Sequence, residues 1–356
     1  MQAEGGAKPV GIRILNALGV GAALIWLLTA VTGIMLAYHF ELNDRIVSPI
    51  APSKDFPGIE RRIAAIEAAG GKAKANWIWT TAGMKDRFFL NYTATDGTLR
   101  NARIAGDGTV LLDMPDGERT ALEWVREVHL SLAAGKTGEW ILAISGILLL
   151  ASLSIGAIGS LRRSGRWQAL LEPDRSGRTG AWFRRIGLAG VIPAFVVVAA
   201  AVVIHFEHSI EGPIGAPPIT TPAIPPAGDG AGFAAAARAA EAAVPGSRFV
   251  GGTMPTATDA SFRLWVNQPG EYFRADGYGG SLVVVNGNDA SVRGAWPLQK
   301  ASAAYKFMAL PYPVHTGEIA GPLGRVLVML VGLWLATMVV LGLILRRRAA
   351  RGAAGS

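Results

Sequence analysis

The sequence predicts an α-helical membrane protein, built as an internal duplication, that carries two α+β domains outside the bilayer. Three observations predict this fold class: four long apolar runs, two long polar segments between them, and a motif that occurs in both halves. Each run is about long enough to cross a hydrocarbon core of ~30 Å as a helix. Arg325 is the only charged residue within them. The runs comprise residues 15–38, 140–161, 186–206 and 323–345.

The distribution of basic residues predicts the orientation of these helices, because Lys and Arg are retained on the cytoplasmic side of short loops. Thirteen basic and three acidic residues lie in the N-terminus, in the loop from Arg162 to Arg185 and in the C-terminal tail. Both termini are therefore expected in the cytoplasm of a bacterial cell, with the polar segments in the periplasm. The predicted order is a cytoplasmic N-terminus (1–14), a first helix (15–39), a first periplasmic domain (40–138), a second helix (139–162), an Arg-rich cytoplasmic loop (163–185), a third helix (186–206), a Pro-rich linker with a second periplasmic domain (207–322), a fourth helix (323–345) and a cytoplasmic tail (346–356).

Composition excludes several classes of function. The chain has no cysteine, which excludes disulfides, Fe–S clusters and covalently attached c-type haem. It has neither a Gly-x-Gly-x-x-Gly fingerprint after a strand nor a P-loop lysine, so no flavin or nicotinamide site is expected in this chain. The net charge of +8 follows from the basic cytoplasmic segments and does not indicate nucleic-acid binding. The first apolar run is expected to be a retained signal anchor.

The first polar segment predicts one helix packed on a small antiparallel sheet. Residues 55–70 form an amphipathic pattern, and short β-like runs follow it. Asp96-Gly97 and Asp107-Gly108 are hairpin-turn signals between these runs. The expected strands are residues 76–81, 87–93, 99–104 and 110–113.

The second polar segment predicts the same order of elements after an extended connector. Residues 212–228 are rich in proline, which favours a semi-rigid linker. An Ala-rich helix is expected at 232–244, and Asn286-Gly287-Asn288 predicts a turn before the last strand. The expected strands are residues 248–252, 261–266, 281–286 and 291–294.

The internal repeat is visible in the residues themselves. The first and third runs both end in His-Phe-Glu, at His39 and His205. Before the second and fourth runs come Val-His pairs, each with a glycine nine residues past the histidine. These are His129 with Gly138, and His315 with Gly324. The chain therefore reads as two copies of helix, outer domain and helix.

All five histidines lie near the outer ends of the apolar runs, which predicts a haem site. Imidazole is an axial ligand of haem iron, and two histidines on different helices can hold a b-type haem between them. The candidates are His39, His129, His205 and His315, for one or two haems per chain, with His208 one helical turn beyond His205. Which histidines pair is left open, and the alternatives are interfacial histidines and a metal ion without porphyrin.

Other residues near these histidines allow two interpretations of their role. Trp26, Trp140 and Trp334 can line a haem pocket, but interfacial or lipid-facing packing is the favoured interpretation. Three carboxylates can orient imidazole N–H groups, although simple solvated carboxylates are the favoured interpretation here too. These are Glu41, Glu207 and Glu318.

The segment Tyr312-Pro313-Val314-His315-Thr316-Gly317-Glu318, followed by Gly321-Pro322-Leu323-Gly324-Arg325, resembles a motif of the PepSY-associated transmembrane helix family. That family includes inner-membrane reductases of ferric siderophores, and its members have a Tyr-Pro-Leu-His-Thr-Gly-Glu segment that leads into a Gly-Arg helix start. The resemblance covers nearly the whole chain. The sequence departs from many members at the cytoplasmic ends of the first and third helices, where His-Arg is replaced by Leu15-Asn16 and Arg184-Arg185.

The resemblance implies PepSY-like outer domains and a haem-dependent ferric (ferrisiderophore) reductase in the bacterial inner membrane. It implies that electrons from quinol or a membrane partner pass through haem b to a periplasmic acceptor, ferric iron in a siderophore. No residue is assigned a catalytic role. The alternative is a haem-free accessory protein whose PepSY-like domains bind a periplasmic partner or protease.

Overall fold

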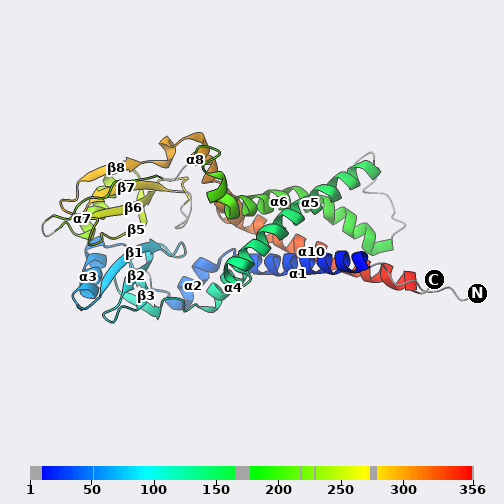
Figure 1. The fold of residues 1–356 in the computed structure, drawn as a ribbon, viewed down its shortest axis with the longest axis horizontal. Coiled ribbons are helices and arrows are strands. Elements are labelled where there is room, and N and C mark those ends of the chain that lie inside the picture. Colours follow the sequence, from blue (N-terminus) through cyan, green and yellow to red (C-terminus); the bar gives the residue numbers. More distant parts are fainter. Residues whose placement is uncertain are drawn as a thin grey trace, which may run out of the picture. The chain divides into compact units, whose positions relative to one another are not determined.

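The chain folds into two units, and each is assembled from segments that are far apart in the sequence (Figure 1). The computed structural model describes residues 10–50, 52–164, 177–216, 219–227, 230–272 and 279–354. The helical unit comprises Met1–Ala37, Glu123–His205 and Val314–Ser356. The sheet unit comprises Tyr38–Leu122 and Phe206–Pro313. The Arg-rich loop predicted at 163–185 and the N-terminal segment at 1–14 lie largely outside the described residues.

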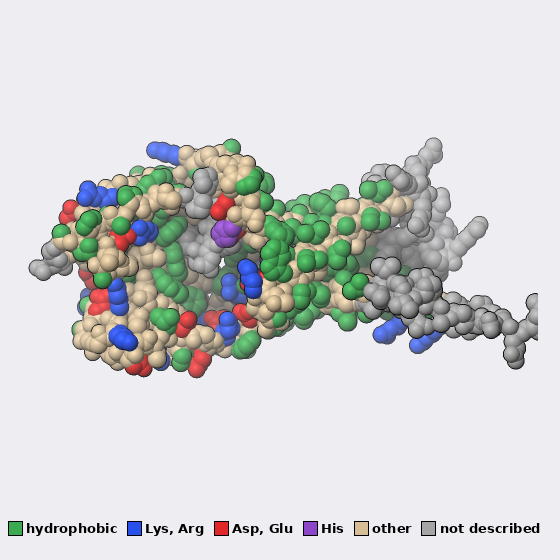
Figure 2. All heavy atoms as spheres, viewed as in Figure 1, with side chains coloured by type: hydrophobic (Ala, Val, Ile, Leu, Met, Phe, Trp, Pro, Cys, Tyr) green, Lys and Arg blue, Asp and Glu red, His purple; other side chains and the backbone are tan. Residues whose placement is uncertain are grey.

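Four long helices form the helical unit. They are α1 (Val10–Leu36), α5 (Gly135–Ser164), α6 (Gly177–Ile210) and α10 (Gly321–Ala354). All four are long and apolar enough to cross a membrane. The surface of these helices is covered by apolar side chains (Figure 2). An apolar surface of this kind suits lipid tails and not water. The prediction of four membrane helices at these positions is confirmed, and the bilayer is the environment of this unit.

Small residues and tryptophans pack these helices together. A Cβ at Gly332 on α10 would lie 2.8 Å from the side chain of Ile34 on α1, so glycine permits close helix approach there. The indole N–H groups of Trp26 and Trp334 donate to backbone carbonyls of Ser145 (3.0 Å) and Ile186 (2.6 Å) on neighbouring helices. Both tryptophans therefore serve helix packing, in agreement with the favoured interpretation.

The predicted helices and strands of the two outer segments lie in the sheet unit, close to their expected positions. The first segment contains α3 (Phe56–Glu67), β1 (Lys74–Thr80), β2 (Arg87–Thr93), β3 (Leu99–Ala105) and β4 (Val110–Pro115). The second contains α7 (Phe233–Ala243), β5 (Arg248–Thr253), β6 (Ser261–Asn267), β7 (Ser281–Asn286) and β8 (Val292–Trp296). Gly97 and Gly108 adopt positive φ in the two predicted hairpin turns.

The strands of both copies form one antiparallel sheet in the order β4-β3-β2-β1-β5-β6-β7-β8. The sequence predicts a small sheet for each outer segment, whereas the structure joins the two through β1 and β5, where Ile78 lies opposite Gly252. The physical reason is that β1 and β5 would each be an unpaired edge in separate sheets. One apolar core, including Ile59, Leu90 and Leu264, unites α3 and α7 with the sheet.

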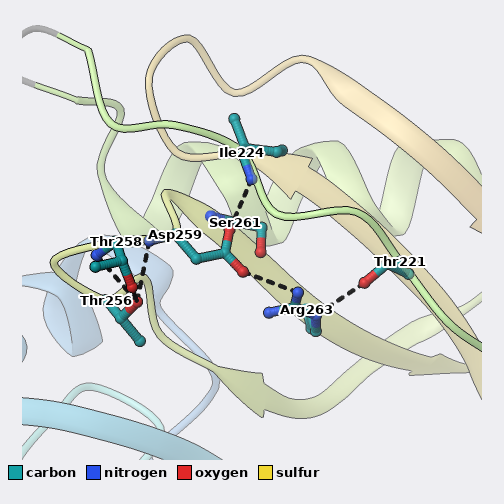
Figure 3. Close-up of polar contacts among 7 residues, drawn as sticks. All are labelled: Thr221, Ile224, Thr256, Thr258, Asp259, Ser261 and Arg263. Atoms are coloured by element: carbon teal, nitrogen blue, oxygen red, sulfur yellow. Dashed lines mark hydrogen bonds and ion pairs between the residues drawn. The ribbon is translucent and has the colours of Figure 1, made fainter.

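The proline-rich segment has no regular secondary structure in its described residues and is fastened to the sheet (Figure 3). The Asp259 carboxylate accepts a hydrogen bond from the backbone N–H of Ile224 (2.9 Å) and forms an ion pair with Arg263 (2.8 Å). Arg263 also donates to the Thr221 hydroxyl (2.9 Å). Burial alone raises the pKa of Asp259, but its hydrogen bonds, including that from Ser261, lower it to about 2. This group of contacts is called the linker anchor.

A second carboxylate fastens α2 (His39–Val47) to the sheet. Asp44 is buried and accepts hydrogen bonds from the Thr81 hydroxyl (2.5 Å) and the Met84 backbone N–H (2.7 Å). The equally buried Arg103 lies 3.8 Å away, and Arg87 contributes a further positive charge. Burial raises the pKa of Asp44, and these hydrogen bonds and charges offset only part of that rise. This group of contacts is called the α2 anchor.

Candidate functional site

The structure brings two of the five histidines together within the helical unit. His129 lies in the last turn of α4 (Ala121–Ser131), and His315 lies near the end of α9 (Pro311–Thr316). Their ring centroids are 6.1 Å apart, and the ring planes are inclined by 31°. The two histidines occupy equivalent places in the sequence repeat, just before α5 and α10. Two of the candidate histidines named from the sequence are thus neighbours in the structure.

The glycine nine residues after His129 explains how the first of these histidines is positioned. A Cβ at Gly138 on α5 would lie 1.6 Å from the carbonyl oxygen of Ser131, at the end of α4. Leu132 and Ala133, between the two helices, adopt φ of 54° and 55°. Non-glycine residues in this left-handed region mark a tightly constrained turn. The first turn of α5 thus packs directly against the helix end that carries His129.

The second copy repeats this arrangement with different residues. A Cβ at Gly324 on α10 would lie 2.0 Å from the carbonyl oxygen of Gly317. Gly317 itself has φ of 81°, a conformation that glycine adopts without strain. In both copies a glycine nine residues past the histidine meets the carbonyl of the residue two past the histidine. The spacing noted in the sequence is therefore a packing requirement that fixes each histidine beside a membrane helix.

Each imidazole is held through its Nδ1 atom. His315 Nδ1 lies 3.0 Å from the carbonyl oxygen of Val197 on α6, and His129 Nδ1 lies 2.9 Å from the hydroxyl oxygen of Thr32 on α1. A carbonyl can only accept a hydrogen bond, so Nδ1 of His315 carries the proton in the neutral ring. Its Nε2 then bears the lone pair that a metal requires. The neighbouring Gly33 admits His129, because a Cβ there would lie 3.2 Å from His129 Cε1.

Burial favours the neutral form of the His315 imidazole. Desolvation lowers the pKa of His315, and the hydrogen bond to Val197 only partly opposes that effect. A histidine must be neutral at the coordinating nitrogen in order to bind a metal. The surroundings of His315 therefore favour the protonation state of a ligand.

The other three histidines have different surroundings. His205 contacts Trp140 edge to face, with 5.4 Å between ring centroids. His39 lies in the sheet unit, where its ring is 3.8 Å from that of Phe40. The side chain of His208, also in the sheet unit, is 73% exposed and lies 3.3 Å from the Glu211 carboxylate.

The donor set fits haem better than a bare metal ion. Among the described residues, no group of three or more His, Asp or Glu side chains is placed to hold a metal ion. A bare ion such as zinc usually takes three or four protein ligands, whereas a porphyrin supplies four nitrogens and leaves two axial positions. Two imidazoles, each oriented through Nδ1, match the axial requirement. His129 and His315 are thus the residues that would hold a b-type haem.

Two of the carboxylates considered from the sequence lie beside other side chains. Glu318 lies 3.5 Å from Arg325, and Glu207 lies 3.8 Å from His208. The orienting groups are Thr32 and the carbonyl of Val197, which the sequence analysis missed. A signal was present, because Thr32 precedes His39 by seven residues and Val197 precedes His205 by eight. The two partners of Nδ1 therefore occupy nearly equivalent places on α1 and α6.

Comparison with known proteins supports the relationship inferred from the motif. A search of curated proteins finds no match to this sequence. A family model described as the PepSY-associated TM region matches residues 16–348, which include all four membrane helices and both outer segments. The chain belongs to the family of proteins with a PepSY-associated transmembrane region.

Proposed function

We propose that the helical unit binds a b-type haem through His129 and His315 and that the protein transfers single electrons to a periplasmic acceptor. The observation that carries this proposal is the approach of the two rings to 6.1 Å, with each Nδ1 beside an oxygen atom. Haem bound there would supply a one-electron carrier at the end of the membrane helices. His39 and His205 are the other two histidines at equivalent positions of the sequence repeat.

The proposed topology places the sheet unit in the periplasm and both termini in the cytoplasm of a bacterial inner membrane. The concentration of Lys and Arg in the loop between α5 and α6 and in the two termini supports it. We also infer that the chain arose by duplication, since a helix and four strands follow in the same order in each half. All five histidines lie at the periplasmic end in this topology, so electrons are expected from quinol or from a membrane partner.

Ferric iron in a siderophore is the acceptor that family membership favours. Transfer of one electron to Fe(III) gives Fe(II), which hard oxygen ligands bind less tightly. The chain's own residues would hold the two imidazoles in place through α1 and α6 during this transfer. Nicotinamide or flavin chemistry would reside on another protein.

The first test is a reduced-minus-oxidised visible spectrum of the full-length protein in detergent, with haem quantified as the pyridine haemochrome. A b-type α-band with about one haem per chain is expected if His129 and His315 form a site, and about two haems per chain would indicate a second site. His129→Ala and His315→Ala should each remove the haem held by the pair, whereas His208→Ala is the matched control because His208 is exposed. A colourless protein from haem-replete cells would instead support the haem-free accessory function.

A second experiment tests the acceptor. The protein is reduced with a quinol analogue, and a ferric siderophore is added while the α-band is recorded. Reoxidation by the ferric complex, but not by the same siderophore loaded with redox-inert Ga(III), is expected. If both complexes leave the band unchanged, the haem serves another acceptor.

A further inference from the structure

We infer that Thr32 is a positioning residue that selects the tautomer of His129, so that Nδ1 carries the proton and Nε2 bears the lone pair. The consequence of this inference for haem rests on the proposed function, but the tautomer itself does not. Thr32 is 6% exposed and lies on α1, where its hydroxyl oxygen is 2.9 Å from His129 Nδ1. The inference concerns which of these two atoms gives the proton.

The single proton of the Thr32 hydroxyl already has a partner. The hydroxyl oxygen lies 2.8 Å from the carbonyl oxygen of Leu28 and 3.2 Å from that of Thr29, and both carbonyls can only accept. A threonine hydroxyl in a helix commonly donates to the carbonyl three or four residues earlier. Since that proton points back along α1, the oxygen presents a lone pair toward His129. His129 Nδ1 must then be the donor, which leaves Nε2 unprotonated in the neutral ring.

His315 is also protonated at Nδ1, but through a contact with the backbone and not with a side chain. His315 donates from Nδ1 to the backbone carbonyl of Val197, and no side-chain substitution removes that acceptor. His129 depends instead on one side-chain hydroxyl. The two imidazoles of the pair are therefore held in matching tautomers, but only the Thr32 contact can be removed by mutation.

The chain offers a closely matched set of variants. Thr32→Val keeps the shape of the side chain but removes the acceptor oxygen. Thr32→Ser keeps that oxygen and should restore the wild-type behaviour. Thr29→Val is the control, because the Thr29 hydroxyl makes the same backward contact to Ile25 (3.0 Å) and lies one turn away on the same helix. Each variant loses the hydrogen bond from the hydroxyl to the carbonyl one turn earlier. Any effect of that loss alone should therefore be equal in Thr29→Val and Thr32→Val.

The decisive measurement is the nitrogen NMR spectrum of the full-length protein, labelled at histidine and purified from haem-starved cells at a pH where the rings are neutral. Five histidines give few signals, and His129→Asn assigns the one of interest. Wild type, Thr32→Ser and Thr29→Val should show His129 protonated at Nδ1, while Thr32→Val should show a substantial Nε2-protonated population. Wild-type protein with His129 protonated at Nε2 would overturn the inference.

A haem titration separates this inference from the proposed function. Ferric haem added to the same proteins should bind Thr32→Val ~10–100-fold more weakly than wild type, the usual loss when a ligand's hydrogen-bond partner is removed. Thr32→Ser and Thr29→Val should bind like wild type. If no variant binds haem while the tautomers follow the expected pattern, the proposed function fails and the role of Thr32 stands. Equal haem affinity in Thr32→Val and Thr29→Val would refute the role of Thr32 in holding a ligand.

Discussion

The α2 anchor and the linker anchor fasten two segments to one sheet with opposite electrostatics. In the α2 anchor, Asp44 is almost fully buried with Arg103, and burial raises the pKa of its carboxyl. In the linker anchor, Asp259 retains some solvent exposure and accepts several hydrogen bonds, which lower the pKa of its carboxyl to about 2. Polar neighbours therefore favour the ionised carboxylate of Asp259, whereas similar neighbours leave the ionised carboxylate of Asp44 disfavoured.

The comparison teaches that depth of burial decides the outcome. Asp44 accepts two hydrogen bonds and faces two arginines, yet the loss of solvation outweighs them. Asp259 stays close to water, so its hydrogen bonds and its ion pair with Arg263 give a net gain. The α2 anchor is thus expected to be the more sensitive of the two, because its polar groups are buried and water cannot replace a lost partner.

The largest expected effect is that of Asp44→Asn. An amide at this place offers only one acceptor oxygen to the buried donors of Thr81, Met84 and Arg103, and each buried donor left unsatisfied typically costs ~1–3 kcal/mol. Urea unfolding of the full-length protein in detergent, followed by the circular dichroism of the sheet, should show this loss. Glu118→Gln, an exposed charge removal in the same unit, is the control and should stay within about 0.5 kcal/mol of wild type. Equal stability of the two variants would contradict the proposed dependence on Asp44.

Asp259→Asn should have a smaller effect. The fall in pKa from 3.8 to about 2 corresponds to roughly 2 kcal/mol of stabilisation near neutral pH. The amide keeps one acceptor oxygen, so part of the contact to Ile224 survives. The same urea titration measures this loss, and a penalty larger than that of Asp44→Asn would reverse the order inferred from burial.

The pH dependence of these two variants should have opposite signs. A lowered folded-state pKa gives stability that is present above the ordinary value of 3.8 and is lost as the pH falls toward 2, so wild type should approach Asp259→Asn in acid. A raised folded-state pKa gives stability that is present below 3.8 and is lost as the pH rises through the folded value. The advantage of wild type over Asp44→Asn should therefore grow in acid. Parallel trends for the two variants would contradict the assigned directions.

Thr221→Val should have the smallest effect. The hydroxyl of Thr221 accepts from Arg263 at the margin of the linker anchor, and loss of one such hydrogen bond costs about 1 kcal/mol. Protection of the Ile224 amide against hydrogen exchange is the more specific measurement, because that N–H donates to Asp259. Faster exchange at Ile224 with unchanged exchange in β2 would localise the effect to the linker.

Local patterns in the sequence were sufficient to predict the elements of the fold. Apolar runs located the membrane helices, and alternation with Asp-Gly turns located β2 and β3 to within one residue. The pairing of β1 with β5 was not predictable, because it joins strands separated by two membrane helices and leaves no local signal. The two anchors were missed for the same reason: Asp44 and Asp259 are ordinary polar residues until tertiary structure buries or surrounds them.

For the candidate site, the repeat identified His129 and His315 but could not pair them. Their approach depends on how α4 and α9 end, which includes two non-glycine residues with positive φ. The sequence did not identify Thr32, because a threonine within an apolar run resembles any other helix-packing residue.

The continuity of the sheet also sets an order of events during synthesis. The ribosome completes β1 to β4 before α5 and α6, and only afterwards makes β5, which covers the open side of β1. At 5–20 residues per second the nascent first half therefore waits roughly seven to thirty seconds with an unprotected edge. During that interval the half-sheet is expected to bind chaperones. In a chain truncated after α5, the edge of β1 would stay uncovered.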